Sequence, residues 1–193
     1  DTGKASGMSP EDLAELTAEV LRRFGAIKRA HKKLGDLRAK QKWMDDPEYQ
    51  KHQDSILKEL VNFRFASKFV ELLCDKIRTF IIQIRTHERQ IMEFCIENSK
   101  MPRAHFVKNF PGNETDLKWL KEQMKADKPY VVELDKRKHD ILDQQHKLIA
   151  LEIEFGIPIK NFKEINKQMT SGEFKAKKAK REMIEANLRL VIS

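Results

Sequence analysis

Two stretches rich in lysine and arginine hold the side chains with the clearest chemistry in this sequence. Nine basic residues stand between positions 22 and 42, against one acid, Asp36. Four of them recur at intervals of seven and four residues, which on a helix places them on one side, opposite a Leu and Phe stripe. Such a face attracts phosphate or carboxylate groups. The candidate contacts in this stretch are Arg22, Arg29, Lys32, Lys33 and Lys40.

The second basic stretch packs five basic residues and no acid into positions 175–181. They are Lys175, Lys177, Lys178, Lys180 and Arg181. On a helix these side chains cover most of the circumference instead of forming one stripe. A charge run of this kind is often only a solvated surface, so contact with an acidic partner and simple solvation both stay open.

Motifs for catalysis or metal binding are absent from the sequence. It contains no phosphate-cradling glycine loop, no HExxH and no GxSxG. His139 and His146 lie seven residues apart with two aspartates between them, which is not a ligand set typical of zinc. His31 and His87 lie on apolar stripes, where a hydrogen-bonded core histidine is the common explanation. We therefore expect no enzyme activity, no metal and no cofactor.

The composition indicates an all-α protein with a real core. The 193 residues are 40% hydrophobic and 35% charged, with a formal net charge of +8, and they include only seven glycines and six prolines. No window alternates apolar and polar residues for long, so strands are not expected. Cys74 and Cys95 lie about 30 Å apart on one helix, so they cannot pair. Without a signal peptide or a membrane-length apolar run, the chain is expected to be cytoplasmic.

A long helix from Ser67 to Asn98 is the element that the other helices must cover. Its apolar residues are spaced by threes and fours and form a stripe wide enough to need several neighbours. We expect a bundle of about six to eight helices around it. The middle of the core should consist of Leu73, Ile77, Phe80 and Ile84.

Capping and turn residues divide the rest of the chain. Ser9 should begin a long helix that keeps one apolar face to about Met44. A short helix is expected over residues 102–110, and Asn113 or Thr115 should cap the next one. Pro129 should open a long helix that Gly156 ends. Ser171 and Gly172 should separate an amphipathic segment from a last helix. This last helix has no stop signal, and its end, Leu188 to Ser193, is strongly apolar. We therefore expect the sequence to be a piece of a longer protein.

The last 21 residues, EFKAKKAKREMIEANLRLVIS from Glu173 to Ser193, resemble the opening of conserved region two in the primary (housekeeping) sigma factor of bacterial RNA polymerase. The segment EANLRLVIS carries most of this resemblance. Three upstream segments resemble the large variable insert that precedes that region. They are RTHERQIMEFCIENSKMP, NFPGNETDLKWL and INKQMTSGE. The resemblance is good from Phe63 to Ser193 and loose from Ser9 to Asn62.

The resemblance implies a parent protein that binds core RNA polymerase, with the β′ subunit as the main contact, and directs it to promoter DNA. The segments that read and melt the promoter would follow Ser193. Residues 1–8 are polar and rich in glycine, so we expect a flexible leader there. The resemblance further implies a helical insert domain at 9–170 and the start of region two at 171–193. The alternative is a structural helical module that binds partner proteins and has no role with nucleic acid. No membrane contact or small-molecule ligand is expected.

Overall fold

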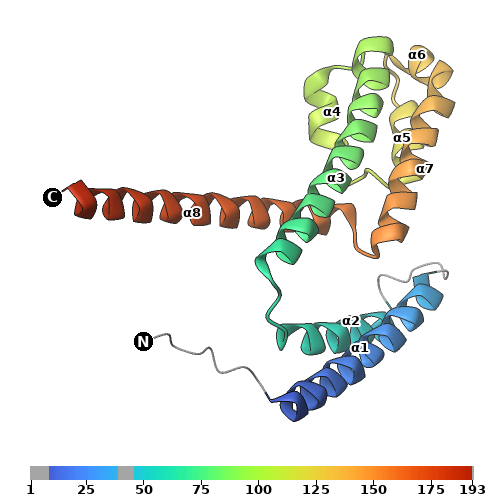
Figure 1. The fold of residues 1–193 in the computed structure, drawn as a ribbon. Coiled ribbons are helices and arrows are strands. Elements are labelled where there is room, and N and C mark those ends of the chain that lie inside the picture. Colours follow the sequence, from blue (N-terminus) through green and yellow to red (C-terminus); the bar gives the residue numbers. More distant parts are fainter. Residues whose placement is uncertain (1–8, 39–45, 193) are drawn as a thin grey trace. The chain divides into compact units, whose positions relative to one another are not determined.

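The structure is a computed structural model that describes residues 9–38 and 46–192. Within these two stretches every regular element is a helix, so the all-α prediction is confirmed (Figure 1). The elements are α1 (Pro10–Arg38), α2 (Pro47–Val61), α3 (Ser67–Met92), the π-helix η2 (Glu93–Asn98), α4 (Arg103–Asn109), α5 (Leu117–Met124), α6 (Val131–Lys136), α7 (Lys138–Phe155) and α8 (Ile159–Ile192). The chain divides into two compact units, Asp1–Ala66 and Ser67–Ser193, which we call the hairpin and the bundle.

The hairpin pairs α1 with α2 over a small core. Ser9 Oγ accepts a hydrogen bond from the Asp12 amide at 3.1 Å, so the predicted cap of α1 is present. Its core cluster consists of the buried residues Leu34, Leu37 and Tyr49, with Ile56 packed against them. The apolar stripe predicted for the start of α1 is not buried, since Leu13 and Leu16 are 56% and 50% exposed. The reason is length: α2 has 15 residues and covers only part of the 29-residue α1.

Helix α3 is the centre of the bundle, as predicted. Together α3 and η2 occupy the residues 67–98 that the sequence assigned to one helix. Helices α7 and α8 both pack on α3, and η2 contacts α4 and α6. Ile84, Ile91 and Cys95 on this axis are completely buried. Burial raises the pKa of the Cys95 thiol to about 12.

The core of the bundle begins later along α3 than the sequence indicated. Ile84 is buried as predicted, but Leu73 is 41% exposed, and Ile77 and Phe80 are half-buried. Ile77 and Phe80 both pack against the edge of the core, and the ring centroid of Phe80 lies 3.9 Å from that of Phe155 on α7. In the first two turns of α3 the large apolar side chains are between 41% and 50% exposed; they are Phe69, Val70, Leu72 and Leu73.

An aromatic cluster fills the corner between α4 and α5. The rings of Phe106 and Phe110 stack at 4.7 Å, and Trp119 meets Phe110 edge-on at 5.0 Å. The cap of α5 is Asp116, whose carboxylate accepts from the Lys118 amide, and neither Asn113 nor Thr115 takes that role. Asn113 instead donates its side-chain amide to the Asn109 carbonyl.

Two predicted helix boundaries are wrong. The helix expected between Pro129 and Gly156 is divided at Arg137 into α6 and α7, although Gly156 ends it in the left-handed conformation as predicted. In the other case, α8 continues through Ser171 and Gly172. A glycine inside a helix costs only about 1 kcal/mol relative to alanine, and Gly172 is exposed with open space around it, so nothing favours a break there.

Candidate interaction surfaces

The basic face predicted on the first helix is present on α1. At 100° per residue, Arg22, Arg29 and Lys33 lie within about 40° of one another around the helix axis. All three are exposed, and within the described part of the chain none forms an ion pair. Lys32 is exposed too but lies about 80° away from Arg22, and Lys40 is outside the described residues. The α1 basic face therefore consists of Arg22, Arg29 and Lys33.

His31 is not the core histidine that the sequence suggested. Helix α2 meets α1 along the buried line of Ala30, Leu34 and Leu37, and His31 lies outside this line and is exposed. His87 is hydrogen-bonded as predicted, since its Nδ1 lies 2.8 Å from Oε1 of the buried Gln144, but its side chain is only half-buried.

The basic run on α8 is split by the helix geometry. Lys177 and Lys178 each lie three or four residues from both Phe174 and Arg181, so these four residues share one side of the helix. Phe174 is 69% exposed. We call Lys177, Lys178 and Arg181 the α8 basic face. Lys175 and Lys180 point in other directions around the helix, so the run is not one surface. Every described side chain from Phe174 to Val191 is exposed.

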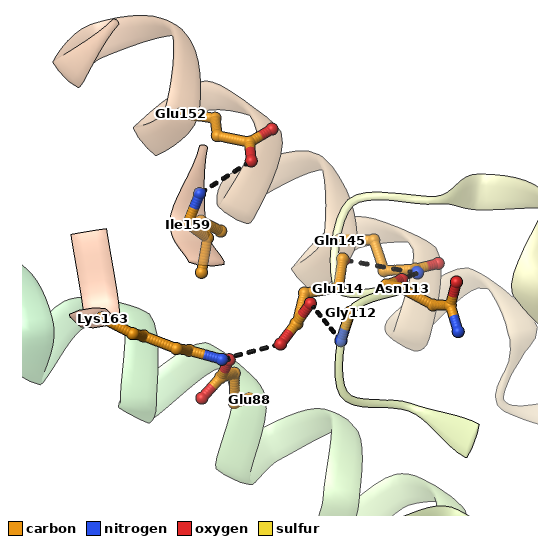
Figure 2. A network of polar contacts seen from close by, with 8 residues as sticks. All are labelled: Glu88, Gly112, Asn113, Glu114, Gln145, Glu152, Ile159 and Lys163. Atoms are coloured by element: carbon orange, nitrogen blue, oxygen red, sulfur yellow. Dashed lines mark hydrogen bonds and ion pairs between the residues drawn. The ribbon is translucent and has the colours of Figure 1, made fainter. Parts of the chain in front are cut away.

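The other end of α8 is held firmly in the bundle. Ile159 and Phe162 are 2% and 6% exposed and belong to the bundle core. One turn further on, the Lys163 ammonium lies 2.5 Å from Glu88 on α3 and 2.7 Å from Glu114 in the α4–α5 loop (Figure 2). A single lysine thus joins three segments that are far apart in the sequence.

The acidic partners of Lys163 are themselves positioned. Glu114 is 7% exposed, and its second oxygen accepts a hydrogen bond from the Gly112 amide at 2.8 Å (Figure 2). The buried Gln145 of α7 donates its side-chain amide to the Asp116 carbonyl at 3.1 Å and fixes the same loop. Burial alone would lower the pKa of Lys163, but its bonds to Glu114 and Glu88 outweigh this and raise the pKa above its ordinary value.

The first amide of α8 is satisfied by a side chain from α7. The Ile159 amide donates to Glu152 Oε1 at 2.9 Å, so the carboxylate serves as a cap supplied by another helix (Figure 2). Burial raises the pKa of Glu152, although this hydrogen bond partly opposes the effect. Further along α8, Glu173 forms an ion pair with Arg78 on α3. Glu173 is the last residue of α8 that binds the body of the bundle through a described ion pair.

The roles of four residues were not predicted from the sequence: Glu88, Glu114, Glu152 and Lys163. Lys163 lies 49 residues from Glu114, and no helical spacing connects residues so far apart. Glu152 precedes its partner amide by seven residues, across a turn. The only available signal was the presence of charged residues beside apolar ones on the predicted stripes.

The sequence matches the protein family described as "Sigma-70, non-essential region" over residues 1–152. The chain belongs to this family. It is also 37% identical over 187 residues to the RNA polymerase sigma factor RpoD of Neisseria gonorrhoeae. The alignment covers 96% of this chain and 29% of that relative, so the chain spans less than a third of the relative's length. The predicted resemblance to the insert of a primary sigma factor is confirmed.

The sigma-70 non-essential region of this chain runs from the hairpin into α7, and α8 lies wholly beyond the matched residues. Glu88, Glu114 and Glu152 belong to the matched region, whereas Ile159 and Lys163 do not. The polar network of Figure 2 therefore attaches α8 to the sigma-70 non-essential region.

Among the described helices, none is long and apolar enough to cross a membrane.

Proposed function

We propose that this chain acts in the cytoplasm as part of a primary sigma factor in bacterial transcription initiation. In this proposal the chain binds core RNA polymerase and catalyses no reaction. The bundle anchors one end of α8, and the exposed remainder of α8 contacts the polymerase, mainly its β′ subunit. Residues 9–170 form the insert domain and residues 171–193 begin conserved region two, with the leader at 1–8. The continuity of α8, from buried Ile159 to its exposed basic residues, is the observation that carries the proposal.

The geometry supports presentation by a rigid helix. An α-helix advances 1.5 Å per residue, so the segment from Phe174 to Val191 reaches roughly 27 Å beyond the last ion pair with the bundle, at Glu173. The bases of the α8 basic face are exposed, and Lys178 has only a long 3.8 Å ion pair with Glu182. An exposed ion pair of this kind contributes little free energy. The three basic side chains of the α8 basic face can therefore bind an acidic partner instead.

Weak attraction to upstream promoter DNA is the second part of the proposal. The α1 basic face and the α8 basic face both present ammonium or guanidinium groups to solvent, and phosphate contacts of this type carry no sequence information. We therefore expect the chain to bind DNA without reading bases. Promoter reading belongs to the parent sigma factor.

The alternative, a helical protein-binding module without a nucleic-acid role, is favoured by one feature of α8. Apolar Phe174, Ile184 and Leu188 are exposed among the lysines, at 69%, 49% and 55%. Such residues suit a protein surface better than a phosphate backbone. Binding to polymerase without any binding to DNA would select this alternative.

The test is a titration of labelled chain with core RNA polymerase. Reversing the α8 basic face with Lys177→Glu, Lys178→Glu and Arg181→Glu should weaken binding by at least about tenfold. The matched control reverses three exposed lysines of the bundle, Lys121→Glu, Lys125→Glu and Lys128→Glu, and so changes net charge equally. Equal losses in both triple variants would reduce the effect to net charge and would refute a contact at α8.

A further inference from the structure

A groove of about 310 Å³ lies on the bundle beside the polar network, and none of its lining residues belongs to either basic face. Helix α3 contributes Arg85, Arg89 and Met92, and α4 with its following turn contributes Val107 and Pro111. The groove thus combines an apolar floor with two guanidinium groups at its edge. Its volume is at the low end for ligand sites and fits one large apolar side chain with its neighbouring backbone.

The charges of the groove leave two cations without internal partners. Its two carboxylates, on Glu88 and Glu114, share one cation, because the Lys163 ammonium lies 2.5 and 2.7 Å from them. With Arg85 and Arg89, the lining has three cations against two carboxylates and so a net positive charge. Arg85 and Arg89 are exposed, and within the described residues neither is paired with a carboxylate. Arginine binds carboxylates with two parallel hydrogen bonds, so the edge of the groove is complementary to acidic side chains.

The apolar floor favours a protein partner over a nucleic acid. Val107 is 55% exposed in the groove, whereas the nearby rings of Phe106 and Phe110 are 5% and 4% exposed. Single-stranded nucleic acid is bound largely by stacking on exposed aromatic rings, and here the rings are covered. An aliphatic or aromatic side chain of a peptide would instead bury the exposed part of Val107.

We propose that this groove binds an acidic protein segment that inserts one apolar side chain between α3 and α4, with its carboxylates on Arg85 and Arg89. The ion network beneath holds α3, the α4–α5 loop and α8 together, so the groove is formed before the partner arrives. This site goes beyond the proposed function, because it uses neither the α8 basic face nor the α1 basic face.

The test uses a fluorescein-labelled peptide of sequence GDDFEELDDG and fluorescence anisotropy on the full chain. Two control peptides separate the contributions: GDDSEESDDG lacks the apolar anchors, and GKKFKKLKKG reverses the charge. We expect the first peptide to bind at least about tenfold more tightly than either control. Single-stranded oligothymidylate should not displace it.

Variants of the chain locate the site. The double variant Arg85→Glu/Arg89→Glu should weaken peptide binding by at least about tenfold, and Val107→Asp should have a similar effect. The matched control is Arg103→Glu/Lys108→Glu, which changes two exposed bases of α4 that do not line the groove and alters net charge equally. This control should change binding by less than about twofold.

A second measurement does not depend on the folding of any variant. In the unmodified chain, the methyl resonances of Met92 and Val107 should shift on addition of the peptide, while those of Leu188 should not. Equal losses in the two double variants would overturn the proposal. So would unshifted methyl groups, displacement by oligothymidylate, or equal binding of the serine-substituted peptide.

Discussion

The hairpin and the bundle both carry exposed basic side chains, but their hydrophobic cores differ greatly in size. Among the described residues the hairpin core has three buried apolar side chains, whereas the bundle core has fifteen. Full burial of a large apolar side chain contributes about 1.5 to 3 kcal/mol, so the hairpin has little to offset its conformational entropy. The α1 basic face therefore lies on a marginal element, and α8 begins in a firmly packed one.

The largest effect is expected from Ile84→Ala in the bundle. Ile84 is completely buried, so the variant loses transfer free energy and leaves a cavity. Urea unfolding should show a loss of about 2 to 5 kcal/mol. A loss below about 0.5 kcal/mol would place Ile84 at the surface.

The equivalent truncation in the hairpin, Leu34→Ala, sharpens the comparison. Leu34 is 3% exposed. Its loss should increase hydrogen exchange throughout α1 and α2 while leaving the unfolding transition of the bundle unchanged. If both variants shifted a single common transition equally, the two units would not differ in the way described.

A smaller loss is expected from Lys163→Met, which leaves Glu88 and Glu114 close together without their shared cation. Breaking a fully buried pair costs about 3 to 5 kcal/mol, and the 37% exposure of the Lys163 side chain reduces this to roughly 2 kcal/mol. Lys160→Met is the control, since Lys160 is an exposed lysine of α8. Equal stability of the two variants would show that the network does not hold α8.

The pH dependence of bundle stability should contain a contribution from Glu152. Its pKa is raised in the folded chain above the ordinary 4.5, so the folded state keeps this proton to higher pH than the unfolded state. The resulting stability is complete below the unfolded pKa and is lost as pH rises through the folded pKa. Glu152→Gln removes the titration and keeps an acceptor for the Ile159 amide.

The difference in unfolding free energy, unmodified chain minus Glu152→Gln, should therefore fall as pH rises above 4.5. Paired urea titrations across the acid range measure it. A difference that grew with pH would mean that the pKa of Glu152 is lowered by its hydrogen bonds.

The sequence predicted those features of the fold that depend on local pattern. Residues 67–98 are helical, and Gly156 ends a helix, because apolar periodicity and a left-handed glycine are local signals. The exposure of Leu73 and His31 was not predictable, since periodicity shows which residues share a side but not how far a neighbouring helix extends. The helix end predicted at Gly172 was wrong for a similar reason. Glycine lowers helix stability only slightly, so on its own it does not end a helix.

The candidate surfaces divide in the same way. The side shared by Arg22, Arg29 and Lys33 follows from helical spacing alone. The groove beside Arg85 and Arg89 forms only where α3, α4 and α8 pack together, and Lys163 comes from the third of these helices. No spacing in the sequence predicts which helices pack together.

The smallest effect is expected in DNA binding. If about four or five lysines and arginines engage phosphates, log K should fall with log salt with a slope near −4, and promoter and random duplexes should bind equally weakly. Charge reversal at Arg22, Arg29 and Lys33 tests the hairpin, and reversal at Lys177, Lys178 and Arg181 tests α8. Tenfold tighter binding of a −10 consensus duplex than of a scrambled one would refute non-specific attraction.

Hydrogen exchange along α8, measured with and without core RNA polymerase, most directly tests presentation of this helix by the bundle. The amides around Phe162 and Lys163 should be protected in both states, because the bundle core and the ion network hold them. The amides of residues 175–181 should exchange faster than those around Phe162 and Lys163 in the free chain, and their exchange should slow when polymerase is added. Unchanged exchange at 175–181 in the presence of saturating polymerase would contradict the proposal.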